Sequence, residues 1–525
     1  MTRPPAESPH GTPCNRLTGR ALCSAVLGVL LLASCTANPG PTPTSSVAGT
    51  TAGGTILSPP ATTTGPISPT GPPLPGRPPN VLIIVTDDQR FDTLDVMPKT
   101  REEFVQGGAL FANGVAATPL CCPSRATIMT GRFPHNTGVL GNGDAELLEQ
   151  DTTLQRYLHD AGYQTGVIGK FLNDWPLEQS PTYFDHVAVV DRGYLNRTWN
   201  LDGNLREVPD YTTTFIGDRA VEDLRAFAEH PEQPWFLYVA TPAPHDPWVP
   251  APEYADSPVP PFLRDPAMRE RDLRDKPDWV ADPGRVFDHP SQETVEGNRA
   301  QQLRTLRSVD DMVGRVFAEL RRLRQSDDTL AFFLSDNGFL WGEHGLAGNR
   351  SESELGAVGV TGKRYPYLPS VRVPFAVRWP GHVPAGTRAD RLASTVDIAP
   401  TALRAAGVTA TGDPPMDGSS LLLPGNSGIW PGADEVYLEY FEDPLYPAVP
   451  SWSSILGNDV HYVRWFDDGG DTIAREYYDL VHDPFELDNL LGDRDTANDP
   501  DTSALDARID HDRKCSGTTG DRACG

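Results

Sequence analysis

Short apolar runs that end in polar residues are the clearest pattern along the chain. Residues 80–85, 235–240 and 329–334 are almost continuously apolar and rich in β-branched and aromatic side chains. Such runs are typical of strands buried on both faces of a parallel sheet, and a shorter run at 165–168 has the same character. The pattern predicts an α/β protein whose polar groups gather at the carboxyl ends of the strands.

Helical periodicity fills the intervals between these runs. Apolar residues between Val309 and Leu323 recur at spacings of three and four, which predicts an amphipathic helix. Shorter helices are predicted at 153–161, where Gly162 ends the pattern, and at 220–228. Each of these helices precedes a strand, as expected when parallel strands are joined by helical crossovers.

The pattern changes in the later part of the chain. A last strand of the main sheet is predicted at 371–377, and a helix opens at 396–401. Beyond about residue 425 the runs become shorter, as at 435–438 and 477–480. Short strands with a helix predict a smaller α+β subdomain at the carboxyl end.

The amino-terminal residues have the order of an export signal. Arg3, Arg16 and Arg20 precede an apolar run, 21–33, which is too short to span a bilayer comfortably. The run ends in Leu-Ala-Ser-Cys, which resembles a bacterial lipobox and would make Cys35 the lipidated first residue of the mature chain. An ordinary cleaved signal, with Cys35 incidental, is the alternative. We expect an exported protein, anchored as a lipoprotein to the outer face of the bacterial cytoplasmic membrane or otherwise secreted.

A tract of Pro, Thr, Gly and Ser follows the signal and has almost nothing to bury. It predicts a disordered or extended tether that holds the rest of the chain away from the envelope. The expected organisation is a signal peptide at 1–35, the tether at 36–79, a catalytic domain at 80–425, and the C-terminal subdomain and tail at 426–525.

The charge and cysteine content narrow the choice of partners. A net charge of −27 over 525 residues argues against nucleic acid or an anionic membrane surface as a partner. The lipid anchor is therefore the one membrane contact that we expect, and any cationic pocket becomes informative.

Among the seven cysteines, Cys515 and Cys524 can close a small disulfide loop in an oxidising compartment or remain unpaired.

The stretch around which the chain is organised is CCPSRATIMTG, residues 121–131. Pro123 suits the first turn of a helix, and Gly131 is placed to end it. Cys121 is therefore expected at a helix N-terminus, where free N–H groups and the helix dipole favour an anion. Arg125, one turn further on, adds a planar donor suited to a tetrahedral oxyanion.

Oxygen-bearing side chains follow two of the predicted strands. Asp87 and Asp88 come directly after the first strand, and Asp336 and Asn337 follow the strand at 329–334. Adjacent carboxylates repel each other, so a cation is their natural partner, and hard oxygen ligands favour Ca²⁺ or Mg²⁺ over zinc. One Asp-Asp pair alone would indicate a solvated turn, but the second half-site favours a metal.

Three further candidates are cationic. Lys170 follows the strand at 165–168, His245 lies among prolines after the strand at 235–240, and Lys363 is the only lysine in its loop. A proline-restricted backbone suits a catalytic histidine that must keep its position. A lysine at a strand end is ordinarily solvated and a lone histidine is ordinarily structural, so these residues need further support.

That support comes from a family resemblance. The pattern C-x-P-S-R-x-x-x-[LM]-T-G at Cys121 resembles the signature of the type I sulfatases. The resemblance implies that a formylglycine-generating enzyme oxidises Cys121, and not Cys122, to formylglycine, whose hydrated aldehyde is the nucleophile. The motif alone leaves a buried thiol pair or a strained vicinal disulfide as alternatives.

Other motifs extend the resemblance over about residues 79–491. The family implies one Ca²⁺ ion held by Asp87, Asp88, Asp336 and Asn337, together with an oxygen of the modified Cys121. G-Y-x-T-x-x-x-G-K resembles the second signature and places Lys170 on the sulfate, while P-H-x-P gives His245 contact with the ester oxygen. Lys363 becomes the second active-site lysine. The implied fold is alkaline-phosphatase-like, a mixed or parallel sheet between helices.

Two positions depart from the family pattern. Many relatives have a histidine where this chain has Leu172, and Asn173 is a candidate substitute. The glutamate that usually follows the tyrosine of K-x-x-x-Y-E is here Leu368, and the loop at 347–362 has the character of an insertion. The second departure makes the assignment of Lys363 less direct.

The predicted function is hydrolysis of a sulfate monoester in a sulfated small molecule or glycan. Arg125, Lys170 and Lys363 would bind the sulfate, with Asp336 as proton acceptor and His245 as proton donor. The motif details resemble the N-acetylglucosamine-6-sulfatase branch, which favours a carbohydrate 6-O-sulfate. The alternatives are a phosphomonoesterase or phosphodiesterase of the alkaline phosphatase superfamily, and an inactive tethered binding lipoprotein with an intact thiol.

Overall fold

The computed structural model describes residues 77–281, 291–346, 362–412, 414–423, 428–429, 432–444 and 449–524. All of them belong to one compact unit, Thr64–Gly525. The predicted signal peptide with Cys35, nearly all of the predicted tether and the segment 347–361 lie outside the described residues. Among the described residues, no helix has both the length and the apolar character needed to cross a membrane.

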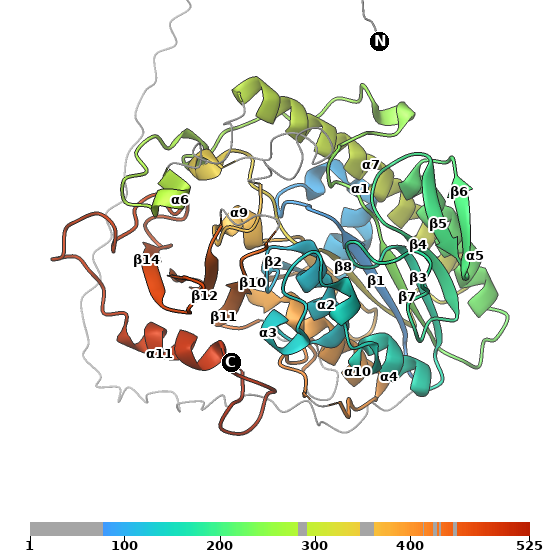
Figure 1. Cartoon of the computed structure of the whole chain (residues 1–525). Helices are drawn as coiled ribbons and strands as arrows, with labels where there is room; N and C mark the ends of the chain where they lie inside the picture. Colours follow the sequence, from blue (N-terminus) through green and yellow to red (C-terminus); the bar gives the residue numbers. More distant parts are fainter. Residues whose placement is uncertain are drawn as a thin grey trace, which may run out of the picture. The chain divides into compact units, whose positions relative to one another are not determined.

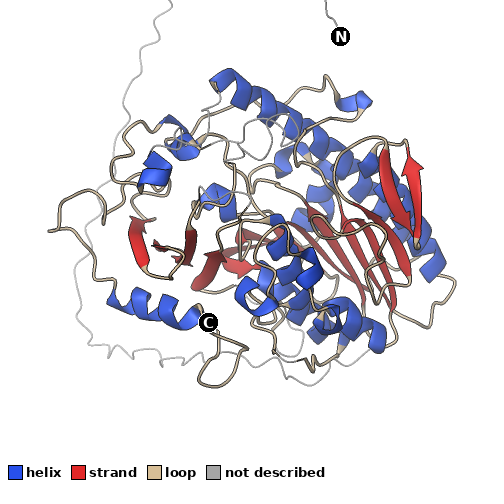
Figure 2. Ribbon diagram, viewed as in Figure 1, coloured by secondary structure: helices blue, strands red, loops and turns tan. Residues whose placement is uncertain are grey.

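A ten-stranded mixed sheet forms the centre of the main body, in the order β10-β2-β9-β8-β1-β7-β3-β4-β5-β6 (Figures 1 and 2). Strand β1 pairs in parallel with β7 on one side and β8 on the other. Strand β9 runs antiparallel to β8 and β2, and β4, β5 and β6 form an antiparallel edge. The strands are β1 Asn80–Thr86, β2 Ala109–Val115, β3 Gln164–Lys170, β4 His186–Val190, β5 Arg197–Leu201, β6 Asn204–Val208, β7 Trp235–Ala240, β8 Thr329–Ser335, β9 Phe375–Arg378 and β10 Thr387–Ser394.

Helices cover both faces of this sheet. Because side chains alternate along a strand, Val81, Ile83 and Val85 pack in one core with helices α2, α4 and α10, whereas Leu82 and Ile84 pack in the other with α5 and α7 (Figure 1). The predicted α/β class with a buried central sheet is therefore confirmed. The helices of the main body are α1 Pro98–Thr100, α2 Cys121–Thr130, α3 Pro134–Thr137, α4 Leu154–Asp160, α5 Thr212–Phe227, α6 Asp278–Ala281, α7 Gln292–Arg322, α9 Leu368–Val371 and α10 Ile398–Ala406, with a π-helix, η2, at Arg101–Gln106.

Several predicted elements differ in extent from those observed. The helices expected at 220–228 and 309–323 belong to the longer α5 and α7, whose polar first turns hide their beginnings from a periodicity search. The strand expected at 371–377 was partly wrong, because its first residue ends α9 and only Phe375–Arg378 is β9. Pro374 immediately before β9 has no N–H to donate to a sheet ladder.

A second, four-stranded antiparallel sheet forms the smaller C-terminal subdomain that the sequence predicted. It contains β11 Glu435–Tyr440, β12 Ser451–Gly457, β13 Val460–Phe466 and β14 Thr472–Asp479, followed by helix α11 Ser503–Asp512. Its apolar residues, such as Trp452 and Trp465, share a buried cluster with Leu120, Tyr365 and Tyr367 of the main body. The smaller sheet thus packs directly against segments that lead to the predicted site.

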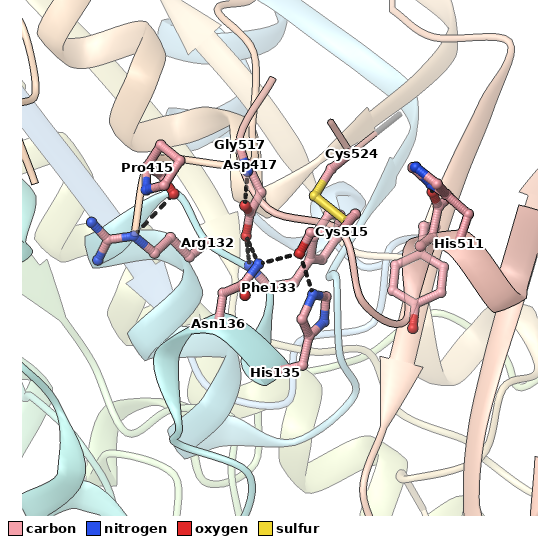
Figure 3. The surroundings of a disulfide bond; sticks show 12 residues. Arg132, Phe133, His135, Asn136, Pro415, Asp417, His511, Cys515, Gly517 and Cys524 are labelled. Atoms are coloured by element: carbon pink, nitrogen blue, oxygen red, sulfur yellow. Dashed lines mark hydrogen bonds and ion pairs between the residues drawn. A yellow bond between two sulfur atoms is a disulfide. The ribbon is translucent and has the colours of Figure 1, made fainter. Parts of the chain in front are cut away.

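The end of the chain is closed by a disulfide between Cys515 and Cys524 (Figure 3). The carbonyl oxygen of Cys515 accepts hydrogen bonds from Asn136 Nδ2 at 2.9 Å and from the His135 ring at 3.1 Å. Gly517 N donates to Asp417 Oδ1 at 2.7 Å. The disulfide loop therefore lies against α3, which is separated from the motif helix α2 by three residues.

His135 should make the stability of this region depend on pH. Burial lowers the pKa of His135, but the charge and hydrogen bond of Glu439 outweigh it and raise the pKa from 6.5 to about 9. Because the folded pKa lies above the unfolded one, the stabilisation is complete below pH 6.5 and is lost as the pH rises towards 9. Between pH 6.5 and pH 9 the free energy of unfolding of the unaltered protein should fall with rising pH. This fall should exceed that of His135→Gln by at most about 3 kcal/mol.

Urea unfolding at pH 6 and pH 9 measures this effect. His482→Gln is the matched control, since that histidine is exposed and pairs with Asp479 on the surface. The same pH dependence in both variants would contradict the role of His135.

Candidate active site

The ends of the neighbouring strands β1 and β8 bring the predicted oxygen ligands together. Thr86 at the end of β1 is aligned with Ser335 at the end of β8, so the residues that follow both strands emerge side by side. Asp88 N donates to Asp336 Oδ1 at 3.2 Å, and Asn337 Nδ2 donates to Asp88 Oδ1 at 2.7 Å. The two half-sites, which are far apart in the sequence, therefore form one site.

The motif helix α2 delivers Cys121 to this site. Leu120 is the extended residue before the helix, Cys121 is its first residue, and Gly131 ends it with a left-handed φ of 66°. All ten helical residues are buried. Cys121 Sγ lies 3.4 Å from Asp87 Oδ1 and 3.9 Å from Asp88 Oδ1. The predicted placement of this cysteine at a helix N-terminus and next to the acidic pair agrees with the structure.

Three buried cations surround the same point. Lys170 Nζ donates to Asp87 Oδ2 at 2.5 Å, and Lys363 Nζ donates to Asp88 Oδ1 at 2.6 Å and to Cys121 Sγ at 2.9 Å. Arg125 Nε donates to Asp336 Oδ2 at 2.7 Å, while its Nη1 donates to the carbonyl oxygen of Lys170 at 2.7 Å. Each of these three cations, which the sequence analysis selected, therefore lies in the site of Cys121 and close to a carboxylate.

The aspartates differ in their affinity for protons. Burial alone would raise the pKa of Asp87, but Lys170, His245, Arg125 and Lys363 together hold it well below its usual value. Burial and the negative charge of Asp87 raise the pKa of Asp336 to about 6, although Arg125 opposes this. Asp336 is therefore the better proton acceptor of the two near neutral pH.

Cys121 itself is not activated as a thiolate. Burial raises the pKa of its thiol well above the usual range, and the nearby Lys170 and Lys363 offset this only in part. An unmodified side chain at this position remains a neutral thiol, which is a poor nucleophile.

His245 follows β7 and faces the acidic pair. Its Nδ1 lies 2.9 Å from the carbonyl oxygen and 2.8 Å from the carboxylate of Asp246, and its Nε2 lies 3.7 Å from Asp88 Oδ2. Burial lowers the pKa of His245, but Asp88, Asp87 and Asp246 raise it to about 9. Tyr194, which no sequence motif singled out, donates to the His245 carbonyl oxygen at 2.5 Å. The histidine is held as a cation whose Nε2 points toward the site.

The donor set fits a hard metal ion. Atoms of Asp87, Asp88, Cys121 and His245 lie within 4.8 Å of one another, and Asp336 joins this group through its contact with the backbone of Asp88. The side-chain oxygen of Asn337 is buried and has no hydrogen-bond partner among the described residues. An unsatisfied buried acceptor is costly, and together with three carboxylates it matches the oxygen ligands that Ca²⁺ prefers.

The departure from the family pattern at Leu172 can also be placed. Leu172 is buried, and Asn173 is 5% exposed with its side-chain oxygen lacking a hydrogen-bond partner among the described residues.

Sequence reasoning missed the pair formed by Arg90 and Glu343, which joins the turn after β1 to the loop at 342–345. The only sequence signal for that pair is the proximity of each residue to a metal half-site.

The fold and the site together define an alkaline-phosphatase-like protein, with a mixed sheet that carries a buried cluster of carboxylates and cations at its strand ends. The sequence profile of the family described as Sulfatase matches residues 79–408, which is more than half of the chain, so this chain belongs to the sulfatase family. A second profile, described as N-sulphoglucosamine sulphohydrolase, C-terminal, matches residues 356–513.

Named relatives agree with this assignment. The human N-acetylglucosamine-6-sulfatase is 28% identical over 470 residues, which cover 79% of this chain and 81% of the human protein. The N-acetylglucosamine-6-O-sulfatase of Bacteroides thetaiotaomicron is 26% identical, with 79% and 83% covered. Extracellular sulfatase homologues from Caenorhabditis elegans and Drosophila melanogaster are 33% and 31% identical over 65% and 66% of this chain, but the match spans only 48% and 31% of their own length.

Solved structures show the same architecture. One, described as a complex with its substrate D-glucosamine-2-N,6-O-disulfate, superposes with a TM-score of 0.64 at 25% identity and covers 83% of this chain and 96% of that one. A phosphonate monoester hydrolase from Silicibacter pomeroyi superposes with a TM-score of 0.61 at 22% identity, covering 82% and 94%, and shares the fold.

Proposed function

We propose that this protein hydrolyses sulfate monoesters with a formylglycine formed from Cys121. The observation that carries the proposal is the position of Cys121 Sγ, at a helix N-terminus, 2.9 Å from Lys363 Nζ and 3.4 Å from Asp87 Oδ1. A sulfate monoester is nearly inert in water, so its hydrolysis needs several positive groups around the SO₃ unit. The sulfatase profile over residues 79–408 supports this reaction class.

Asp87, Asp88, Asp336 and Asn337 would hold one Ca²⁺ ion, with the atom at Cys121 Sγ standing for an oxygen of the modified residue. The ion would supply a fixed positive charge for the sulfate oxygens. Formylglycine, made by a formylglycine-generating enzyme, would supply a hydrated aldehyde in place of the neutral thiol.

The protein's own side chains have separate roles in the proposed reaction. Arg125, Lys170 and Lys363 bind the sulfate oxygens and orient the sulfur for attack by a hydroxyl at residue 121. Asp336 accepts the proton that this hydroxyl loses, since its pKa of about 6 suits a general base near neutral pH. His245 donates the Nε2 proton to the ester oxygen as the S–O bond breaks, and Asp246 keeps the ring in place.

The substrate that we propose is a 6-O-sulfated N-acetylglucosamine or a similar sugar. Relatives named N-acetylglucosamine-6-sulfatase match about four fifths of the chain, and a similar solved structure is described with a sulfated glucosamine as its substrate. We also propose that the chain is exported and tethered by a lipid on Cys35, with domain boundaries near residues 79 and 425. The export signal and the Pro/Thr-rich tract support this part of the proposal.

Hydrolysis of phosphate or phosphonate esters is the second candidate, because phosphonate monoester hydrolases share the fold. The test compares 4-nitrophenyl sulfate, 4-nitrophenyl phosphate and N-acetylglucosamine 6-sulfate as substrates of the calcium-loaded protein. We expect both sulfate esters to be hydrolysed and the phosphate ester to be at least about a hundredfold poorer in kcat/KM. Preference for the phosphate, or an inert protein with an intact thiol at Cys121, would overturn the proposal.

A further inference from the structure

The segment that carries Lys363 is a buried strap, residues 362–371, which we call the lysine strap. On one side it is held by the main body. Gly362 O accepts from Leu340 N at 2.6 Å, Ser370 O accepts from Gly338 N at 2.9 Å, and Val371 O accepts from Ala116 N at 2.8 Å. These contacts fix both ends of the strap, and in its middle the ring of Tyr367 packs against the His344 ring, with 4.2 Å between the ring centroids.

The smaller C-terminal sheet and the loop after it hold the middle of the strap. Trp452 Nε1 on β12 donates to the carbonyl oxygen of Arg364 at 2.7 Å. Tyr367 OH donates to Glu476 Oε2 on β14 at 3.0 Å, and Leu368 N donates to Glu486 Oε2 at 2.8 Å. All three groups on the C-terminal side are buried. The backbone on the carboxyl side of Lys363 is therefore fixed by residues that lie about a hundred positions later in the chain.

Glu476 is built as a rigid acceptor. It is fully buried, and it also accepts hydrogen bonds from Trp465 Nε1 at 2.6 Å and from Tyr478 OH. Glu486 is held in the same way, since its second oxygen contacts the His461 ring at 2.6 Å. A buried carboxylate with all its partners in place has one defined position and transmits that position to the group it binds.

The strap needs such support because of what Lys363 must do. Its Nζ lies 2.6 Å from Asp88 Oδ1 and 2.9 Å from Cys121 Sγ. Because the lysine side chain is long and flexible, a defined position of Nζ requires a backbone that is itself held in place. Five residues beyond Lys363, the backbone N–H of Leu368 donates to Glu486 Oε2 at 2.8 Å. The C-terminal residues thus supply a carboxylate to the strap.

We propose that Glu476 and Glu486 are positioning residues that act on the reaction through Lys363, with Tyr367 as the link on the strap. This inference rests on the proposed function of Lys363 as a sulfate-binding group. It assigns the C-terminal sheet a part in the active site, although none of its residues need touch the reacting atoms.

Two tyrosines provide a matched test, because Tyr367 and Tyr478 are both fully buried and donate to the same oxygen of Glu476. Only Tyr367 belongs to the strap. We expect Tyr367→Phe to lower kcat/KM by about tenfold, the equivalent of one hydrogen bond to a charged acceptor, and Tyr478→Phe to lower it much less. Urea unfolding should show similar stability losses for both variants. Equal losses of kcat/KM in the two variants would overturn the inference.

A double-variant comparison separates positioning from general damage. If Tyr367 acts through Lys363, then Tyr367→Phe should add no further loss of kcat/KM in a Lys363→Ala background. Additive losses would overturn the inference. Should Tyr367→Phe fold poorly, Glu486 gives the same test, since Glu486→Gln keeps an oxygen acceptor for Leu368 N and should restore most of the activity that Glu486→Ala loses. An equal loss in Glu486→Gln and Glu486→Ala would count against positioning.

Binding of inorganic sulfate distinguishes this inference from the proposed function. If the unaltered protein hydrolyses no sulfate ester, the proposed function fails, but calorimetric sulfate binding still reports on Lys363. Tyr367→Phe should then weaken sulfate binding in the same direction as Lys363→Ala, and Tyr478→Phe should leave it nearly unchanged. Unchanged sulfate affinity in Tyr367→Phe would overturn the inference independently of catalysis.

Discussion

Replacing Cys121 by alanine should abolish sulfate-ester hydrolysis, with a loss in kcat of at least about 10⁴-fold. The physical reason is that residue 121 supplies the attacking hydroxyl in the proposed reaction, whereas the carboxylates that contact Arg125, Lys170 and Lys363 would hold the ion. Sulfate release from 4-nitrophenyl sulfate measures the loss, and the mass of the tryptic peptide with residue 121 shows whether the unaltered protein carries an aldehyde there.

Cys122→Ala is the matched control for this prediction. Cys122 is an equally buried thiol one residue away, and its backbone N–H donates to Asn142 Oδ1 at 3.1 Å. It should keep most of the activity. Cys121→Ser should complete at most one slow turnover, because the sulfate ester of a serine has no internal means of leaving. Sustained turnover by Cys121→Ser would contradict a formylglycine mechanism.

Replacing Asp87 by asparagine should remove both calcium binding and turnover, with a loss in kcat/KM of about 10³-fold or more. The carboxylate of Asp87 is the one whose pKa four cations hold well below its usual value, so it stays charged at all ordinary pH and suits a metal ligand. Loss of its charge also leaves the buried Lys170 without the carboxylate that it contacts at 2.5 Å. The variant should therefore unfold at a lower temperature even without calcium.

Thermal unfolding with and without calcium provides a readout that does not depend on catalysis. Calcium at about a hundred times its dissociation constant should stabilise the chelator-treated, unaltered protein by about 2.7 kcal/mol and should not stabilise Asp87→Asn. Asp92→Asn is the control, because Asp92 follows the same strand but pairs with Arg90 at a partly exposed position. If calcium stabilises Asp87→Asn as much as the unaltered protein, Asp87 is not a ligand.

The parts of the fold that the sequence predicted are those in which burial is nearly complete. Strands β1, β7 and β8 are buried on both faces, and their apolar runs could be found without knowing their neighbours. The edge strand β6 has four exposed residues out of five and depends on pairing with β5, so no local pattern marks it. Sheet order also could not be predicted, because it follows from long-range pairing.

The residues of the candidate site that the sequence predicted are likewise those marked by a local pattern. Asp87, Asp336 and Lys170 were found because each directly follows or ends a predicted strand, and strand ends converge at one edge of the sheet. Lys363 was selected only as the lysine available in its loop, and the structure places it against Cys121. Tyr194 and Glu476 could not have been selected, because their contacts join segments that no motif relates.

The complete burial of α2 determines when Cys121 is accessible for modification. Every residue from Cys121 to Thr130 is buried, and the apolar residues Cys122, Ala126, Ile128 and Met129 pack in the same core as the sheet and helices α4 and α10. Because Cys121 is fully buried, an enzyme that oxidises its thiol has no access to it in the folded protein. If Cys121 is converted as proposed, we expect the conversion to precede complete folding, and a chain that folds first should keep an unmodified thiol at residue 121.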